Sequence, residues 1–141
     1  MKEVKDTKRA TVYVGFDGKV HKRFLGPHAD LRFQNEVRVL QYLEKQACSF
    51  VPRLIHTEPD ELYMVTTNCG AIVDKISDER LKTIFAELEQ YGVEHGDPFA
   101  RNITYSRHLG RFCVIDFEFA RIIATGEGLS IKDLEEMDAN E

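Results

Sequence analysis

The chain carries its strongest pattern in His95-Gly96-Asp97-Pro98-Phe99-Ala100-Arg101-Asn102, followed by Ile115-Asp116-Phe117-Glu118. Carboxylates and one carboxamide recur in it at short spacing. In phosphoryl transfer, one acid orients a hydroxyl nucleophile, and an amide and a second acid hold Mg²⁺ against the phosphates of a nucleotide. The pattern therefore favours nucleotide-dependent phosphoryl transfer as a function.

Each of these polar residues also has a simpler explanation when it is taken alone. Asp97 precedes a proline and can be a turn former, and Asn102 can be a turn or cap residue. Asp116 ends the apolar run 112–115, where an isolated acid is costly to bury. A metal ion or a cation beside it removes that cost, and an ordinary salt bridge to Arg101 or Arg121 is the alternative. The ordered recurrence, rather than any single residue, carries the prediction.

A second pair of charged residues lies earlier in the chain. Alternation in a strand places Lys22 on the same face as Val20 and Phe24, which is unusual for a half-buried strand. Glu36 falls within the apolar stripe of the next helix, where a carboxylate needs a partner. We expect Lys22 and Glu36 to form an ion pair. The alternatives are a lysine that extends to solvent and a Glu36 that reaches water or Arg32.

Periodicity and turn signals predict an α+β domain. Residues 1–10 are charged and are expected to be loose. The expected elements are strands at 11–14 and 19–24, a helix from Asp30 as its cap to about Gln46, strands at 52–56 and 62–66, a hinge at 67–70, a helix from Ser77 to Tyr91, a strand at 93–95, a hairpin of 103–105 and 112–115, and a short helix capped by Ser130 with Asp133 in the capping-box position.

Composition limits the classes of function. The 141 residues suffice for one domain with a core, and the net charge of −5 argues against a nucleic-acid partner. No apolar run approaches the ~20 residues of a membrane span, and the N-terminus lacks the apolar stretch of a signal peptide. Three cysteines without Cys-x-x-Cys spacing argue against a disulfide framework or thiolate zinc site. We therefore expect a cytoplasmic protein with no membrane partner.

From Val20 to about Arg121 these motifs resemble the protein-kinase-like superfamily. The His-Gly-Asp and Asp-Phe-Glu forms are most similar to its atypical branches, such as aminoglycoside and choline phosphotransferases, lipopolysaccharide-core kinases and the small tRNA-modification-associated kinase. The resemblance implies a small antiparallel-sheet N-lobe with one helix and hinge (1–70), a truncated, mostly helical C-lobe (71–126) and an acidic tail (127–141), together one minimal kinase-like domain.

The resemblance also implies roles for individual residues, with ATP and Mg²⁺ as cofactors. Lys22 would hold the α and β phosphates and Glu36 would orient it. Asp97 would be the catalytic base, Asn102 and Asp116 the Mg²⁺ ligands, and His95 a structural brace. The nucleotide-binding set would be Val20, Lys22, Thr66, Thr67, Asn68 and Cys69.

The chain departs from the family in two respects. Gly15-Phe16-Asp17-Gly18 does not match the glycine-rich flap that a kinase carries between its first two strands, and the pattern predicts no counterpart of the family's first strand. The segment after Asp116 is also short for an acceptor domain.

An ATP-dependent phosphotransferase, with a protein Ser/Thr hydroxyl slightly favoured as acceptor, is the leading expectation. A pseudokinase or nucleotide-binding adaptor that acts through a protein partner is the alternative, and an unrelated α+β domain with chance motifs is the third. A homo-oligomer is compatible with Phe99, Phe117 and Phe119.

Overall fold

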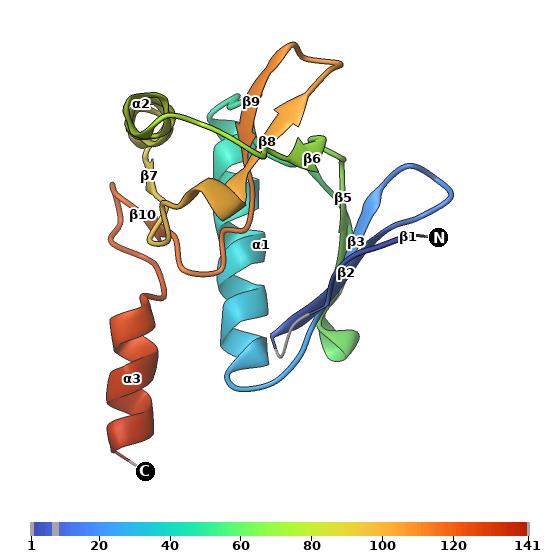
Figure 1. Ribbon diagram of the computed structural model, residues 1–141. Helices are drawn as coiled ribbons and strands as arrows, with labels where there is room; N and C mark the ends of the chain where they lie inside the picture. Colours follow the sequence, from blue (N-terminus) through green and yellow to red (C-terminus); the bar gives the residue numbers. More distant parts are fainter. Residues whose placement is uncertain (1, 7–8, 141) are drawn as a thin grey trace.

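The first half of the chain forms an antiparallel five-stranded sheet. The structure is a computed structural model that describes residues 2–6 and 9–140. The strand order is β1-β2-β3-β5-β4 (Figure 1). The strands are β1 (Lys2–Asp6), β2 (Ala10–Val14), β3 (Val20–Phe24), β4 (Leu54–Glu58) and β5 (Tyr63–Thr66), and a short 3₁₀ turn, η1 (Pro59–Glu61), joins the last two.

The expectation that residues 1–10 are loose is wrong for the first strand. β1 pairs with β2, with Lys2 opposite Val14 and Asp6 opposite Thr11. A charged segment lacks the alternation of apolar residues that predicts a strand. Its backbone can still form hydrogen bonds with the unpaired N–H and C=O groups at the edge of a sheet. The Asp17-Gly18 turn consequently joins the second and third strands. The connection between the first two strands includes residues 7–8, which lie outside the described part.

One helix, α1 (Ala29–Lys45), connects β3 to β4 and lies between the sheet and the rest of the molecule (Figure 1). The expectation that Asp30 caps it is wrong. The helix follows His28, which has a left-handed φ of 57°, and Asp30 lies within the first turn, where its charge favours the positive helix end. The Arg32 side chain fixes this entry, because it donates to the Leu25 and Pro27 carbonyls.

The second half contains less helix than expected. The predicted helix is present as α2 (Asp78–Gln90), and the Ser77 hydroxyl accepts the Arg80 N–H as its cap. Residues 71–126 otherwise form two small sheets, β6-β8-β9 and β10-β7. "Mostly helical" is thus a wrong description, because turns divide this segment into extended runs too short for helix formation. Its remaining elements are β6 (Ala71–Ile72), β7 (Val93–Glu94), the 3₁₀ turn η2 (Ala100–Asn102), β8 (Ile103–Ser106), β9 (Arg111–Val114) and β10 (Arg121–Ile122).

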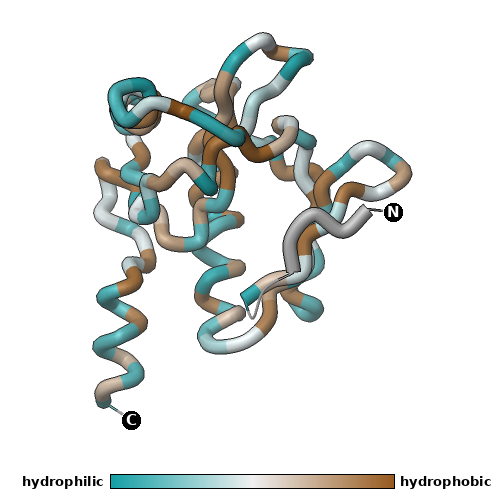
Figure 2. Tube along the Cα trace, viewed as in Figure 1, coloured by the Kyte–Doolittle hydropathy of each residue, from teal (hydrophilic) through white to brown (hydrophobic). Residues whose placement is uncertain are grey.

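The final helix, α3 (Ile131–Ala139), begins with the predicted capping box. The Ser130 hydroxyl accepts the Asp133 N–H at 3.0 Å, and the Asp133 carboxylate accepts the Ser130 N–H at 2.9 Å. The helix projects from the body of the molecule (Figure 1), and hydrophilic and hydrophobic residues alternate along it (Figure 2). Local hydrogen bonds, rather than burial, therefore define this helix.

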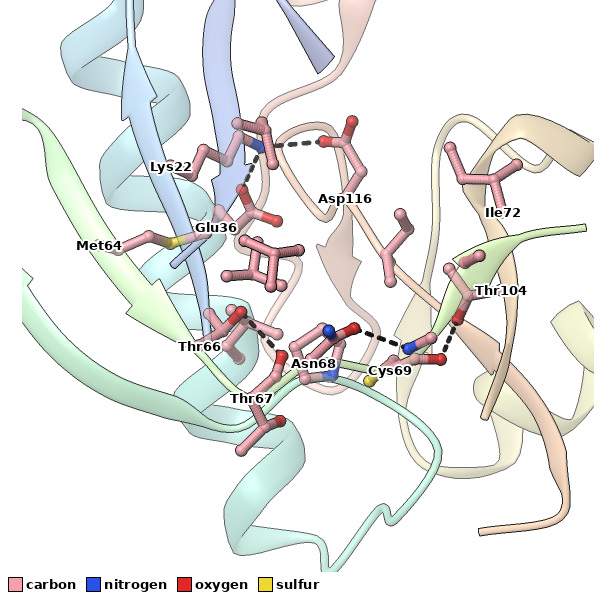
Figure 3. A pocket seen from close by; sticks show the side chains of 18 residues that line it. Lys22, Glu36, Met64, Thr66, Thr67, Asn68, Cys69, Ile72, Thr104 and Asp116 are labelled. Carbon is pink, nitrogen blue, oxygen red and sulfur yellow. Dashed lines mark hydrogen bonds and ion pairs between the residues drawn. The ribbon is translucent and has the colours of Figure 1, made fainter. Parts of the chain in front are cut away.

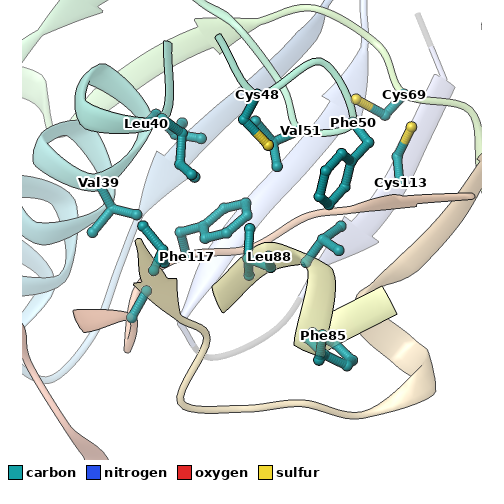
Figure 4. Close-up of a cluster of buried hydrophobic side chains, with 14 of the residues drawn as sticks. Val39, Leu40, Cys48, Phe50, Val51, Cys69, Phe85, Leu88, Cys113 and Phe117 are labelled. Atoms are coloured by element: carbon teal, nitrogen blue, oxygen red, sulfur yellow. The ribbon is translucent and has the colours of Figure 1, made fainter. Parts of the chain in front are cut away.

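One hydrophobic core serves both halves of the chain (Figure 4). Leu40 of α1, Leu88 of α2 and Phe117 are all buried in it. Among the described helices, none has both the length and the apolar character needed to cross a membrane. The shared core fixes the sheet against the second half, and the candidate site lies where they meet.

Candidate functional site

A cavity of about 340 Å³, here called the central cavity, lies between the sheet and the second half of the chain (Figure 3). Side chains of β2, β3 and β5 form one wall, and Ile115 and Asp116 lie across from them. The structure places all six residues of the predicted nucleotide-binding set on its lining, namely Val20, Lys22, Thr66, Thr67, Asn68 and Cys69.

The connection 67–70 between the two halves is held in a defined conformation. The Asn68 side chain accepts the Gly70 N–H at 2.8 Å, and the Thr104 hydroxyl donates to the Cys69 carbonyl at 2.7 Å. Gly70 has a φ of 93°, and a Cβ there would lie 1.9 Å from the Tyr105 carbonyl oxygen. Only glycine fits this close approach, so the edge of the central cavity is fixed by the backbone.

The predicted ion pair between Lys22 and Glu36 is present, and it belongs to a larger cluster (Figure 3). The Lys22 ammonium donates to Glu36 Oε1 at 2.7 Å, Glu118 Oε2 at 3.1 Å and Asp116 Oδ1 at 3.3 Å. Glu36 also accepts the Phe117 N–H at 2.7 Å. Strand β3, helix α1 and the segment after β9 therefore meet at one ammonium group.

Sequence reasoning missed Glu118 and Arg32 as members of this cluster. Arg32 does not pair with Glu36, the alternative considered above. It is fully buried and donates to Glu118 Oε1 at 2.7 Å. One signal was available, because Glu118 lies two residues after Asp116 and Arg32 lies one turn before Glu36. We name these five residues the ion cluster: Lys22, Arg32, Glu36, Asp116 and Glu118.

Burial and charge act in opposite directions on Lys22. Burial alone would lower its pKa, but Asp116, Glu36 and Glu118 together raise it above the ordinary value. For Glu36, burial raises the pKa, and the neighbouring carboxylates Asp116 and Glu118 add to this effect against the lowering by Lys22, giving a pKa of about 7. The ammonium gains from three acids, whereas each acid shares it with two others. Lys22 therefore stays charged.

The predicted base Asp97 and the predicted metal ligand Asn102 are adjacent, as the spacing suggested. The Asn102 amide donates to Asp97 Oδ2 at 3.0 Å and to the Asp97 carbonyl at 2.9 Å. Arg101 donates to Asp97 Oδ1 at 2.6 Å. Asn102 Oδ1 is buried and has no hydrogen-bond partner among the described residues. We call residues 95–102 the Asp97 loop.

The salt-bridge alternatives for Asp116 do not occur in the described structure. Arg101 pairs with Asp97, and Arg121 pairs with Glu94 at 3.0 Å. Asp116 instead pairs with the Lys22 ammonium at 3.3 Å. Asp116 has a left-handed φ of 65°, a conformation that aspartate tolerates better than most residues.

His95 holds the Asp97 loop in place from the interior of the protein through two hydrogen bonds. Its Nε2–H donates to the Ile115 carbonyl at 2.9 Å, and its Nδ1 accepts the Asp97 N–H at 3.2 Å, which requires a neutral ring. The ring packs edge-on against Phe85 and Phe117, with centroids 5.1 Å away in both cases. Burial lowers the pKa of His95, in agreement with these hydrogen bonds.

The backbone brings the Asp97 loop next to Asp116. Strand β8 begins directly after Asn102 and pairs with β9, and the Ile115 N–H donates to the Asn102 carbonyl at 2.9 Å. Asp97 and Asn102 do not line the central cavity, whereas Asp116 does. Asp116 therefore joins two adjoining regions, the central cavity and the Asp97 loop.

No known protein family matches this chain, and a search of curated proteins found no relative. The functional argument therefore depends on the geometry of the site.

Proposed function

We propose that this protein is an ATP- and Mg²⁺-dependent phosphotransferase of the protein-kinase-like fold that acts on an alcohol group. One observation carries the proposal. The Lys22 ammonium, paired with Glu36, lies at the wall of a cavity that also contains Asp116 and the connection 67–70. These are the residues for which the sequence motifs predicted a joint role.

The central cavity has properties that suit a nucleotide. Its volume of about 340 Å³ is at the lower end of small-molecule sites. Val12, Val20 and Met64 supply apolar surface for a planar base, and Lys22 supplies a buried positive charge for phosphates. Apolar walls with a few convergent polar groups are typical of such sites.

The residues present also fit a magnesium ion. Asn102 Oδ1 is a buried oxygen that lacks a partner among the described residues, and Asp116 supplies a carboxylate nearby along the β8–β9 pairing. Mg²⁺ prefers such oxygen ligands, with phosphates completing its shell. Asn102 and Asp116 would hold the ion, which when bound neutralises charge on the phosphates.

Asp97 would accept the proton of the acceptor hydroxyl. Asn102 and Arg101 hold its two carboxylate oxygens, and His95 holds its backbone N–H. A carboxylate held in this way is suited to aligning a hydroxyl, because phosphoryl transfer depends mainly on positioning. A protein Ser or Thr hydroxyl remains the favoured acceptor, and a small-molecule alcohol is the other.

The fold supports the same proposal in part. The first half is a small antiparallel sheet with one helix, as the resemblance implies for an N-lobe. Because β1 is present, the turn at 15–18 joins the second and third strands rather than the first two.

A nucleotide-binding adaptor without turnover is the second candidate. The observation that favours it is the pairing of both Asp97 oxygens, one with Arg101 and one with Asn102. These two bonds occupy one acceptor site on each oxygen, which leaves less room for an acceptor hydroxyl beside Asp97.

Binding and turnover separate the two candidates. With Mg²⁺ and ADP at about 100 times the dissociation constant, a specific ligand stabilises the folded state by about 2.7 kcal/mol, which thermal unfolding detects. We expect this stabilisation in the native protein and in Asp97→Asn. We expect Asp97→Asn to lower phosphate transfer from ATP about 100-fold or more, and Asp60→Asn, on the exposed η1 turn, to leave it unchanged.

Stabilisation without turnover in the native protein would favour the adaptor. No stabilisation by Mg²⁺ with either ADP or ATP would refute both candidates.

A further inference from the structure

The hydrogen-bond capacity of Lys22 limits what it can bind. An ammonium group has three N–H donors. In this structure they go to three different carboxylates, Glu36, Glu118 and Asp116. A phosphate oxygen can therefore be bound only if one carboxylate is displaced.

The three contacts are unequal. Glu36 and Glu118 lie at 2.7 and 3.1 Å from Nζ, and each side chain is 3% exposed. Asp116 lies at 3.3 Å, and its side chain is 17% exposed. Asp116 also follows Ile115, whose N–H donates to the Asn102 carbonyl of the Asp97 loop. It is therefore the contact that exchanges most readily.

Glu118 cannot exchange in the same way, because Arg32 holds it from behind. Arg32 donates to Glu118 Oε1 and also to the Leu25, Pro27 and Arg9 carbonyls. A fully buried guanidinium with these fixed partners keeps the carboxylate in place. The neighbouring Asn35 amide donates to the Glu118 carbonyl at 2.9 Å and so fixes the backbone as well.

We infer that Glu118, itself held by Arg32, is a positioning residue that fixes Lys22 together with Glu36, so that Lys22 offers a phosphate only the one N–H now donated to Asp116. The part that concerns phosphate rests on the proposed function. The part that concerns the fixed ammonium rests on the contacts alone. Glu118 is not assigned as a metal ligand, because both of its carboxylate oxygens already accept hydrogen bonds, one from Lys22 and one from Arg32.

The test uses the double variant Arg32→Met/Glu118→Gln. It removes one charge of each sign, so the net charge of the ion cluster is unchanged, and Lys22 keeps Glu36 and Asp116 as partners. The matched control is Arg121→Met/Glu94→Gln, which removes an exposed pair with a 3.0 Å contact outside the cluster. Glu118→Gln alone replaces the double variant if the latter does not fold.

The first readout is independent of nucleotide. Lys22 is the one buried lysine within residues 9–140, so its ammonium protons are expected to exchange slowly and to give a ¹⁵N-lysine NMR signal. We expect this exchange to be about tenfold faster or more in the double variant, because a charge-assisted hydrogen bond is lost, and unchanged in the control. Equal protection in all three proteins would overturn the positioning role.

The second readout is affinity for Mg·ADP against affinity for adenosine, which has no phosphates. We expect Mg·ADP to bind about tenfold more weakly to the double variant, because Lys22 is no longer fixed, and adenosine to bind equally. Equal weakening of both ligands would mean that Glu118 maintains the cavity only, and would overturn the inference. Failure of native protein to bind Mg·ADP would refute the proposed function, while the NMR result would still decide the role of Glu118.

Discussion

The ion cluster and the Asp97 loop lie side by side, yet their polar groups are satisfied to different degrees. In the ion cluster all three Lys22 donors are used, and Lys22 is buried. In the Asp97 loop, Arg101 is 56% exposed, and Asn102 Oδ1 has no partner among the described residues. The polar groups of the first region are thus satisfied by the fold, whereas the second region keeps a buried acceptor that the described residues leave unused.

The two regions also differ in how they bind protons. Burial and neighbouring carboxylates raise the pKa of Glu36, whereas burial lowers the pKa of His95 under the Asp97 loop. The two regions therefore contribute to stability with opposite dependence on pH.

The strongest disruption of the ion cluster is Lys22→Met. Three carboxylates would lose their shared cation, and an unpaired buried charge costs about 3–5 kcal/mol. We expect a loss of stability of about that size and a loss of Mg·nucleotide binding, measured by urea unfolding and by titration. Lys19→Met, at an exposed position of the turn before β3, is the control and should change neither. Full stability of Lys22→Met would contradict a stabilising role of the ion cluster, and full turnover would contradict the role of Lys22 in nucleotide binding.

At the Asp97 loop, we expect His95 to make the folded state less stable in acid. The pKa of folded His95 lies below the ordinary 6.5. The unfolded chain therefore binds a proton below pH 6.5 that the folded chain excludes, and stability that is complete above pH 6.5 is lost as the pH falls. Glu36 acts in the opposite sense, because its contribution is lost as the pH rises from about 4.5 to about 7.

The difference between the native protein and His95→Gln isolates the histidine from the other groups. We expect His95→Gln to be less stable at pH 7 and to lose less stability between pH 7 and 5 than the native protein, as measured by urea unfolding. His108→Gln, at the exposed β8–β9 turn, should retain the native pH dependence. Parallel curves for native protein and His95→Gln would contradict a neutral His95.

The smallest expected effect is that of Arg101→Gln. An ion pair with one half-exposed partner contributes less than about 1 kcal/mol and is weakened by salt. We expect a loss of stability below that value in low salt, and no measurable loss in 0.5 M salt. Arg107→Gln serves as an exposed control. A large loss that is independent of salt would mean that Arg101 is as firmly held as the ion cluster.

Local signals in the sequence were sufficient for most elements. Ser77 and Ser130 are caps because their hydroxyls lie next to free helical N–H groups, and this depends on neighbouring residues only. The Lys22–Glu36 pair could be predicted because each residue breaks an apolar period. Strand β1 could not, since its pairing depends on the free edge of β2.

The parts of the site that escaped prediction depend on contacts distant in sequence. Arg32 and Glu118 are 86 positions apart and meet only because the core packs α1 against the segment after β9. The start of α1 at His28 rather than Asp30 likewise follows from Arg32 binding the preceding carbonyls. No pattern within a short window contains this information.

The core in Figure 4 has a further consequence for how a ligand reaches the cavity. Leu40, Leu88 and Phe117 belong to one hydrophobic core. A hinge opening that separates the two halves of the chain would therefore expose this core to water. For the ligand proposed above, we therefore expect entry and release through motions of the sheet margin and its turns. Ligand exchange at the central cavity would then leave the hydrophobic core intact.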